Sequence, residues 1–196
     1  IDTLAVYVHP DNPILKTGLS LEQVAAIFSQ SEAPIERWGQ LGLTGKWTNA
    51  PIRLHGRNPA SGTHAFFKSH ALNKGSFRDS LTEYEGSSEV VRHVGMDPYG
   101  IGYSGIAYKT ADVDTVPLKS KNGAYAKPNQ ANAAGGVYPL TRSLYITLNI
   151  DPSVGPSDLQ KEFVRFVYSR EGQKTVEKVG YFPVDPKLAQ RTLRAF

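Results

Sequence analysis

The residues best suited to chemistry lie in the segment Arg-Asn-Pro-Ala-Ser-Gly-Thr, which runs from Arg57 to Thr63. Residues 52–55, Ile-Arg-Leu-His, precede this segment and predict a short strand. Ser61 is a suitable N-cap, so we expect a helix to begin there and to continue through residue 67. A helix N-terminus carries unpaired N–H groups and the positive end of the helix dipole, and both attract anions. The segment therefore predicts an anion site.

The side chains of this segment suit an oxyanion. Ser61 and Thr63 carry hydroxyls whose protons can turn toward phosphate oxygens, and Gly62 lets a ligand approach the backbone closely. Arg57 supplies a planar fork of donors suited to bidentate contact. A purely structural alternative is that Ser61 caps the helix, Thr63 fills its first turn and Arg57 makes a surface ion pair. No lysine follows at the Walker spacing, so the segment is not a P-loop.

The elements around the segment alternate between strand and helix. Residues 4–8 predict a buried strand, and Ser20 with Gln23 forms a capping box for a helix that reaches Phe28. The other predicted strands lie at residues 52–55, 100–105, 116–118 and 144–150, and the other predicted helices lie at 88–94, from 157 onward, at 169–179 and at 187–193. This alternation predicts an α/β fold with a mainly parallel sheet. The anion site would then lie at the carboxyl edge of the sheet, where α/β proteins bind ligands.

Two segments of the second half bear on the organisation of the chain. Residues 120–136 contain few apolar residues and predict a surface connection between two units. The helix that begins at Ser157 should be strongly amphipathic. Its expected core face consists of Leu159, Phe163, Phe166 and Val167.

The composition of the 196-residue chain narrows the function. Its 40% hydrophobic and 20% charged residues are typical of a soluble globular protein. The absence of cysteine excludes a disulfide framework, a thiolate metal site and a thiol nucleophile. The formal charge is +4, but Lys and Arg are scattered, so we expect a mild attraction for small anions and no nucleic-acid partner. We find neither a membrane span of roughly 18 apolar residues nor a leader, so any export signal has been removed or was never there.

Enzymatic alternatives are poorly supported by the residues. Ser61 and His64 stand three positions apart, but the chain lacks a Gly-x-Ser-x-Gly elbow, and a hydrolase also needs an orienting group and an oxyanion hole. The five histidines show neither zincin spacing nor cysteine companions. Arg142 is interpreted as a hinge or structural ion-pair residue. We therefore expect a protein without enzymatic activity, metal or cofactor.

Five segments, in the same order, resemble the phosphate-binding receptors of high-affinity phosphate ABC transporters. The most informative is the pattern Arg57-x-x-x-Ser61-Gly62-Thr63-x-x-x-Phe67. The others lie at residues 4–13, 97–104 and 138–145 and at 169–173 together with 180–183. Each segment is short, but together they extend over nearly the whole chain.

This resemblance implies the type II periplasmic binding protein fold, in which two lobes close on an oxyanion. Residues 1–137 would form the second lobe with an interlobe crossing at its start, and residues 138–196 the return crossing and the C-terminal part of the first lobe. Members of the family carry an additional N-terminal segment, so the first lobe would be incomplete at its N-terminus. The family's second-lobe ligands fall on four positions here: Arg57, Ser61, Gly62 and Thr63. Many members have an acidic residue where this chain has Pro59, so Arg57 needs another partner or is less constrained.

The resemblance also implies a function. It predicts a periplasmic or secreted solute-binding protein that binds inorganic phosphate and delivers it to the permease of a membrane ABC transporter. Either the sequence is a fragment, or a separate N-terminal segment or a second copy completes the first lobe, or the protein is a reduced variant. The alternatives are the same fold with another oxyanion, an adhesive or regulatory protein that has lost uptake, and a phosphate-releasing enzyme.

Overall fold

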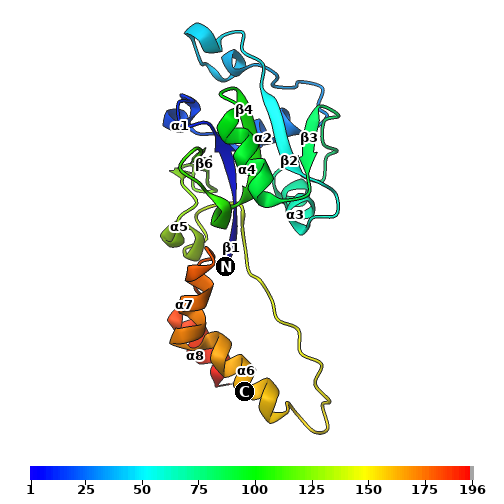
Figure 1. The fold of residues 1–196 in the computed structure, drawn as a ribbon, viewed down its shortest axis with the longest axis vertical. Coiled ribbons are helices and arrows are strands. Elements are labelled where there is room, and N and C mark those ends of the chain that lie inside the picture. The colour runs from blue at the N-terminus through cyan, green and yellow to red at the C-terminus, as the bar shows by residue number, and fades with distance from the viewer. Residues whose placement is uncertain (195–196) are drawn as a thin grey trace.

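A computed structural model describes residues 1–194 and places a sheet above a group of three helices in the view of Figure 1. The strands are β1 (Asp2–Val8), β2 (Arg53–Arg57), β3 (Leu81–Tyr84), β4 (Gly100–Gly105), β5 (Asp114–Thr115), β6 (Leu118–Lys119), β7 (Tyr125–Ala126) and β8 (Thr141–Arg142). The helices are α1 (Ile14–Thr17), α2 (Leu21–Phe28), α3 (Gly62–His70), α4 (Ser87–Met96), α5 (Gln130–Ala134), α6 (Asp158–Tyr168), α7 (Arg170–Lys178) and α8 (Pro186–Leu193). Short 3-10 helices lie at Trp38–Leu41, Gly45–Trp47 and Ile106–Tyr108.

The central sheet has the strand order β3-β2-β4-β1-β5, and β8 also pairs with β1. β2 runs parallel to β3 and to β4, and a helix connects each step of this part of the chain, α3 between β2 and β3 and α4 between β3 and β4. β1 is antiparallel to β4, β5 and β8. The α/β fold predicted from the alternation of strands and helices is confirmed.

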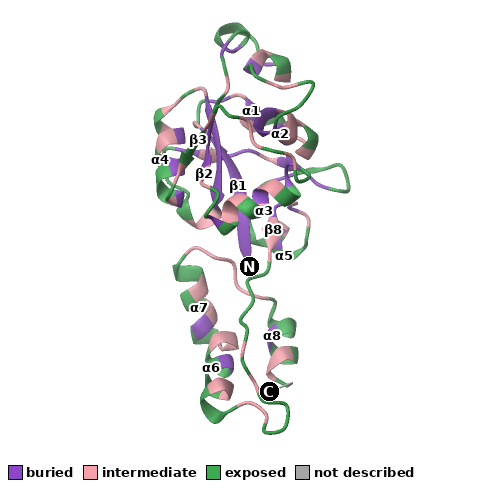
Figure 2. Ribbon diagram, turned by 90° about the vertical axis from the view of Figure 1, so that its right-hand side faces the viewer, coloured by how far each residue is buried: buried purple, intermediate pink, exposed green. Residues whose placement is uncertain are grey.

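The core lies on both faces of β1, which is buried along its whole length. On one face, Leu4 and Val6 pack in the larger cluster with residues such as Phe28, Phe67 and Tyr103. On the other face, Ala5 and Tyr7 pack with the buried side of α4, formed by Val90, Val91 and Val94. A strand covered on both sides needs apolar residues at successive positions, which explains the continuous apolar run at residues 4–8. Figure 2 shows this buried centre in purple.

The helix starts predicted from capping residues are confirmed. Ser20 Oγ accepts the N–H of Gln23 at 3.2 Å, and Gln23 Oε1 accepts the N–H of Ser20 at 2.9 Å. Ser157 forms the same reciprocal box at the start of α6. Ser169 accepts the N–H of Gly172 at 3.1 Å and opens α7. These contacts involve only residues close in sequence, which is why they can be predicted without a tertiary structure.

Three expectations need correction. Residues 120–136 are more than a surface connection, because they hold β7 and α5 and contribute Ala126 to the core. The strand expected at 116–118 is replaced by the two short strands β5 and β6 on either side of residues 116–117. Residues 144–150 form no strand, and Tyr145 is 88% exposed. A strand needs a partner for its backbone groups, and none of the described residues pairs with this segment.

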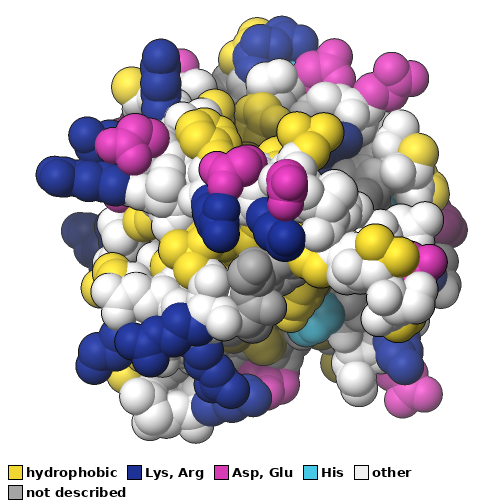
Figure 3. All heavy atoms as spheres, turned by 90° about the horizontal axis from the view of Figure 1, so that it is seen from below, with side chains coloured by type: hydrophobic (Ala, Val, Ile, Leu, Met, Phe, Trp, Pro, Cys, Tyr) yellow, Lys and Arg dark blue, Asp and Glu magenta, His cyan; other side chains and the backbone are white. Residues whose placement is uncertain are grey.

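The core face predicted for α6 is wrong for the described chain. α6 is amphipathic as expected, but Val164 is its only buried residue. Leu159, Phe163 and Phe166 are exposed, and no described residue covers them enough to bury them. Figure 3 views the molecule from the end that carries α6 and α8 and shows hydrophobic side chains at the surface between charged ones. Residues 1–194 therefore leave most of the apolar face of α6 uncovered.

The helical group joins the sheet at the first residue of the chain. The Ile1 amino group donates to the Phe182 carbonyl at 2.7 Å, and the Phe182 N–H donates to the Ile1 carbonyl at 3.1 Å. Gly180 precedes this junction with a φ of 86°, and a Cβ at this position would lie 2.7 Å from Ala107. A larger residue would push the two parts apart there.

Among residues 1–194, none of the helices combines the length and apolar character needed to cross a bilayer.

Candidate anion-binding site

The turn between β2 and α3 carries the predicted site at the carboxyl end of a parallel strand. The N–H of Asn58 donates to the Tyr84 carbonyl at 3.0 Å, which extends the pairing of β2 with β3 by one step. The N–H of Ser61 then donates to the Asn58 carbonyl at 3.1 Å and closes the turn. The chain therefore leaves the sheet edge and enters α3 within four residues, as the sequence predicted.

The N-terminus of α3 is exposed at Gly62. Ser61 caps the helix, since its Oγ accepts the N–H of Thr63 at 3.1 Å. Gly62 is exposed, and a Cβ built on it would meet nothing within 4 Å. Within the described residues, the Gly62 N–H and the Thr63 hydroxyl have no hydrogen-bond partner. Ser61, Gly62 and Thr63 thus come together as expected, although two of the three backbone donors are already used, the Ser61 N–H by the Asn58 carbonyl and the Thr63 N–H by the Ser61 cap.

The guanidinium of Arg57 points toward the start of α4. Its Nη1 donates to Ser87 Oγ at 2.6 Å and its Nη2 donates to the Glu85 carbonyl at 2.7 Å. The backbone carbonyl of Arg57 accepts the Tyr103 hydroxyl at 3.3 Å, and burial raises the pKa of the Tyr103 phenol above its ordinary value. The partner that the sequence left unassigned is therefore Ser87 together with the Glu85 backbone, while Pro59 offers no acceptor in its side chain.

Sequence reasoning missed Ser87 because the contact depends on the register between β2 and β3. The parallel pairing sets Arg57 opposite Tyr84, so that the end of β3 and the beginning of α4 lie beside the arginine. Around Ser87 the sequence indicates only the start of a helix. In the structure this start is marked by the Gly86 N–H, which donates to Glu89 Oε2 at 3.0 Å. Nothing in that pattern indicates which residue of another strand lies alongside.

Arg142 is the second arginine close to α3, and it is a structural ion-pair residue as the sequence suggested. Its Nε and Nη2 donate to Asp2 Oδ2 at 2.9 and 2.8 Å, and the Asp2 side chain is only 8% exposed. Its Nη1 donates to the Gly62 carbonyl at 3.1 Å, and the guanidinium lies 4.8 Å from the centre of the Phe66 ring. Arg142 therefore connects β1, β8 and the first turn of α3.

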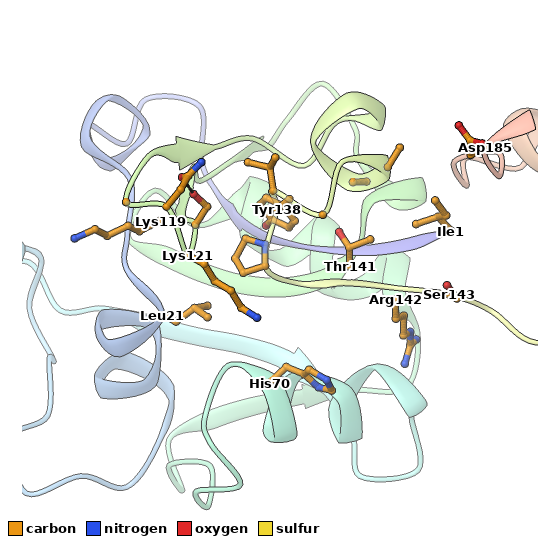
Figure 4. A pocket seen from close by; sticks show the side chains of 18 of the residues that line it. Ile1, Leu21, His70, Lys119, Lys121, Tyr138, Thr141, Arg142, Ser143 and Asp185 are labelled. Atoms are coloured by element: carbon orange, nitrogen blue, oxygen red, sulfur yellow. Dashed lines mark hydrogen bonds between the residues drawn. The ribbon is translucent and has the colours of Figure 1, made fainter. Parts of the chain in front are cut away.

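A large cavity is lined by His70, the last residue of α3, and by none of the four predicted site residues. Its volume is about 1060 Å³, and the side chains labelled in Figure 4 come from the residue before β1, the start of α2, the end of α3, β6 and the turn after it, residues 138–143 around β8, and the N-cap of α8. The charged and histidine side chains around it are Glu22, His70, Lys119, Lys121, Arg142 and Asp185. Arg142 is the one residue of this wall with a hydrogen bond to the predicted site, through Gly62. The donors of the Arg57–Thr63 segment therefore lie outside this cavity.

The structure gives no support to the hydrolase alternative. The His64 ring packs on Phe77 with ring centres 4.4 Å apart, and burial lowers its pKa below the ordinary histidine value. Ser61 Oγ is used in capping the helix, and the two side chains form no hydrogen bond with each other. Within residues 1–194 no three carboxylates and histidines gather as metal ligands would. The donors of the α3 N-terminus can bind an anion but supply no nucleophile–base pair.

Comparisons with known proteins identify the family. Residues 1–171 match the model described as the PBP superfamily domain. The chain is 46% identical over 200 residues to the phosphate-binding protein PstS of Pseudomonas aeruginosa, and the match covers 99% of this chain and 61% of that relative. The fold is similar to that of a possible phosphate binding protein from Planctomyces limnophilus, with a TM-score of 0.72, 24% identity and coverage of 99% of this chain and 68% of the other. It is also similar to an ABC-type phosphate transport receptor from Vibrio cholerae, with a TM-score of 0.69, 21% identity and coverage of 92% and 69%.

The chain spans about three fifths of the length of the curated relative that it matches, whereas the family model extends over most of the chain itself. That model includes the whole central sheet, the turn from Arg57 to Thr63 and the start of α7. The chain therefore belongs to the family of PBP superfamily domains.

Proposed function

We propose that the chain is the ligand-contacting part of a non-enzymatic receptor that binds inorganic phosphate through Arg57, Ser61, Gly62 and Thr63. The observation that carries the proposal is the α3 N-terminus, where Gly62 is exposed and the Gly62 N–H and the Thr63 hydroxyl have no hydrogen-bond partner among the described residues. The helix dipole favours an anion at this point, and the hydroxyls of Ser61 and Thr63 can act as donors or acceptors to its oxygens. The 46% identity to a protein named for phosphate binding supports phosphate as that anion.

The two-lobe organisation is part of the same proposal. Residues 1–137 would form the second lobe, and residues 138–196 the return crossing and the C-terminal part of the first lobe. The exposed apolar face of α6 and the unpaired extended residues 144–150 support a first lobe that needs further strands and helices. The relative's greater length supports a segment of the same protein as the source, ahead of a separate N-terminal segment or a second copy.

The partners follow from this organisation. The protein would act outside the cytoplasm, in the periplasm or secreted, and would hand phosphate to the permease of a membrane ABC transporter after the lobes close. No metal or cofactor is required, because direct hydrogen bonds and one arginine can hold an oxyanion. Another oxyanion is the second candidate, because the open donor set at Gly62 and Thr63 contains no carboxylate that would reject sulfate.

The experiment is a calorimetric titration of phosphate into the protein with both lobes present. Arg57→Ala should weaken binding by about 2–4 kcal/mol, since it truncates a charged partner of the anion. Arg57→Lys should also bind poorly, because an ammonium cannot reproduce the planar fork. Arg92→Ala is the matched control, since Arg92 is an exposed arginine on α4 and its loss removes the same charge.

Three outcomes are informative. Wild-type phosphate affinity in the Arg57→Ala protein would remove this residue from the site. Equal affinity for sulfate in a competition titration would favour the general oxyanion receptor over the phosphate receptor. Turnover of a generic phosphomonoester by the wild-type protein would replace the receptor with an enzyme.

A further inference from the structure

Arg57 is held by two neutral oxygens of the β3–α4 junction. The Ser87 hydroxyl and the Glu85 carbonyl each accept one hydrogen bond from a different amino nitrogen of the guanidinium, at 2.6 and 2.7 Å. The third donor nitrogen, Nε, is buried and has no partner among the described residues. Two hydrogen bonds therefore fix the plane of the guanidinium, and Ser87 supplies the only one that a side-chain substitution can remove.

We propose that Ser87 is a positioning residue for anion binding, which acts by holding the Arg57 guanidinium in the orientation that the anion requires. This inference rests on the proposed function, because it gives Ser87 a role only if Arg57 contacts the ligand. Each amino nitrogen of an arginine has two N–H groups, so a bond to Ser87 leaves another N–H on the same nitrogen. A guanidinium fixed in advance loses less rotamer freedom when an anion arrives, and binding is stronger as a result.

The neutral character of the two acceptors matters for affinity. A carboxylate in their place would compensate the charge of Arg57 directly, whereas a hydroxyl and a carbonyl orient the guanidinium and leave its unit charge in place. The acidic side chain at the start of α4, Glu89, is bonded to the Gly86 N–H. The positive end of α4 also lies beside the guanidinium, which makes an anion the favourable third member of this arrangement.

The backbone of Ser87 is fixed without its hydroxyl. Its carbonyl accepts the Ser104 hydroxyl at 3.3 Å, and α4 is anchored by the buried Val90, Val91 and Val94. Ser87 itself is 8% exposed, so its side chain has little freedom to turn away from Arg57. Removal of the hydroxyl should therefore release the guanidinium while α4 stays in place, and alanine also has the higher helix propensity.

The test is a double-mutant cycle measured by phosphate calorimetry on the protein with both lobes present. Ser87→Ala should raise the Kd for phosphate about tenfold, which corresponds to about 1.4 kcal/mol. In the Arg57→Ala background the same substitution should change the Kd by less than about twofold, because its effect passes through Arg57. Ser87→Thr keeps a hydroxyl and should restore binding. Ser88→Ala, at the exposed neighbouring serine of the same helix, should leave the Kd unchanged.

A spectroscopic measurement keeps the inference testable if a variant folds poorly. In protein with isotope-labelled arginine, NMR can measure how fast the Arg57 guanidinium rotates about its Nε–Cζ bond and so interchanges its two amino groups. This rotation should be slow, because each amino group is bonded to a fixed oxygen. Fast rotation in the wild-type protein would overturn the inference. So would wild-type affinity in Ser87→Ala, or an equal loss of affinity from Ser87→Ala in both backgrounds. Wild-type affinity in Arg57→Ala, together with slow rotation, would instead overturn the proposed function and leave the hold on Arg57 intact as a structural feature.

Discussion

The helices of residues 1–142 and those of residues 143–194 differ in how many of their residues are buried. In the first region α2 buries Val24, Ile27 and Phe28, and α4 buries Ser87, Val90, Val91 and Val94, whereas the other helices there, α1, α3 and α5, bury one residue each. In the second region each helix buries a single residue, which is Val164 in α6, Gly172 in α7 and Ala189 in α8. Figure 2 shows the same contrast, with purple concentrated in the sheet and green and pink in the lower helices.

The difference teaches that helix formation and burial are specified at separate levels. The second-region helices have their caps, since Ser157, Ser169 and Asp185 each accept a backbone N–H of the following turn. Caps and amphipathic spacing act within one helix, whereas burial needs a surface on another element. The second region has the local requirements for folding, and the described chain lacks the surface that its apolar faces need.

The largest expected effect of this contrast is in amide hydrogen exchange of the 196-residue chain. Amides of β1 and β4 should exchange only through global unfolding, because both strands are buried throughout. Amides of α6 should exchange through local opening, with a protection free energy lower by about 4 kcal/mol. Mass spectrometry of the exchanged peptides measures the difference. Uniform protection along the chain would contradict the contrast.

A matched pair of phenylalanine substitutions tests the same contrast through stability. Phe67 is fully buried, with its ring 3.9 Å from that of Tyr103 between centres, whereas Phe166 is 54% exposed. Phe67→Ala should lower the free energy of unfolding by about 3–5 kcal/mol, because it leaves a cavity in the core. Phe166→Ala should cost less than about 1 kcal/mol. Urea denaturation of both variants gives the two values, and equal losses would show that α6 is buried in solution.

A matched pair of arginine substitutions should give a smaller effect. Arg142→Ala would leave the carboxylate of Asp2, which is largely buried, without its partner, and should cost about 2 kcal/mol. Arg165→Ala removes an exposed pair with Glu162 and should cost less than about 0.5 kcal/mol. Both values come from thermal unfolding at one pH. A loss for Arg142→Ala as small as that for Arg165→Ala would mean that the link from β1 to α3 is not formed in solution.

Sequence reasoning could predict the anion loop because its determinants are local. Ser61 caps α3 through a residue two positions away, and the strand before Arg57 sets the loop at the sheet edge. The partner of the Arg57 side chain could not be predicted, because Ser87 is thirty positions away and reaches it only through the parallel register of β2 and β3. Contacts of this kind depend on which strands become neighbours, and a single sequence does not state that.

The same division explains the errors in the second half of the chain. Residues 144–150 have strand composition, and Leu159 and Phe163 stand at helical spacing, so the local preference is correct in both cases. Whether a strand pairs or an apolar face becomes a core depends on a partner surface, which residues 1–194 do not provide. Those predictions assumed a partner, and that assumption was the source of both errors.

The smallest effect concerns pH, and it should fall entirely on the first region, which contains all five histidines. Burial lowers the pKa of His55 below 6.5. The neutral ring lies between Tyr84 Oη at 3.0 Å and Asp97 Oδ2 at 3.3 Å. The His93 ring stacks beside it, and Arg53 bonds to Asp97. The unfolded chain binds a proton near pH 6.5, whereas the folded chain binds it only at lower pH. The stabilising contribution is therefore complete above pH 6.5 and decreases as the pH falls through the range below it.

His64, whose pKa is also lowered by burial, acts in the same direction. Burial tends to raise the pKa of Asp97, but the hydrogen bonds from Arg53, the Tyr99 N–H and His55, together with the charge of Arg53, outweigh it. They lower that pKa below its ordinary value, so the contribution of Asp97 is lost only in stronger acid. His55→Gln should reduce the fall in unfolding free energy between pH 7 and pH 5, and His70→Gln, at an exposed position, should leave that fall unchanged. Denaturant titrations at the two pH values measure it, and an unchanged pH dependence in His55→Gln would show that this histidine is not buried in the neutral form.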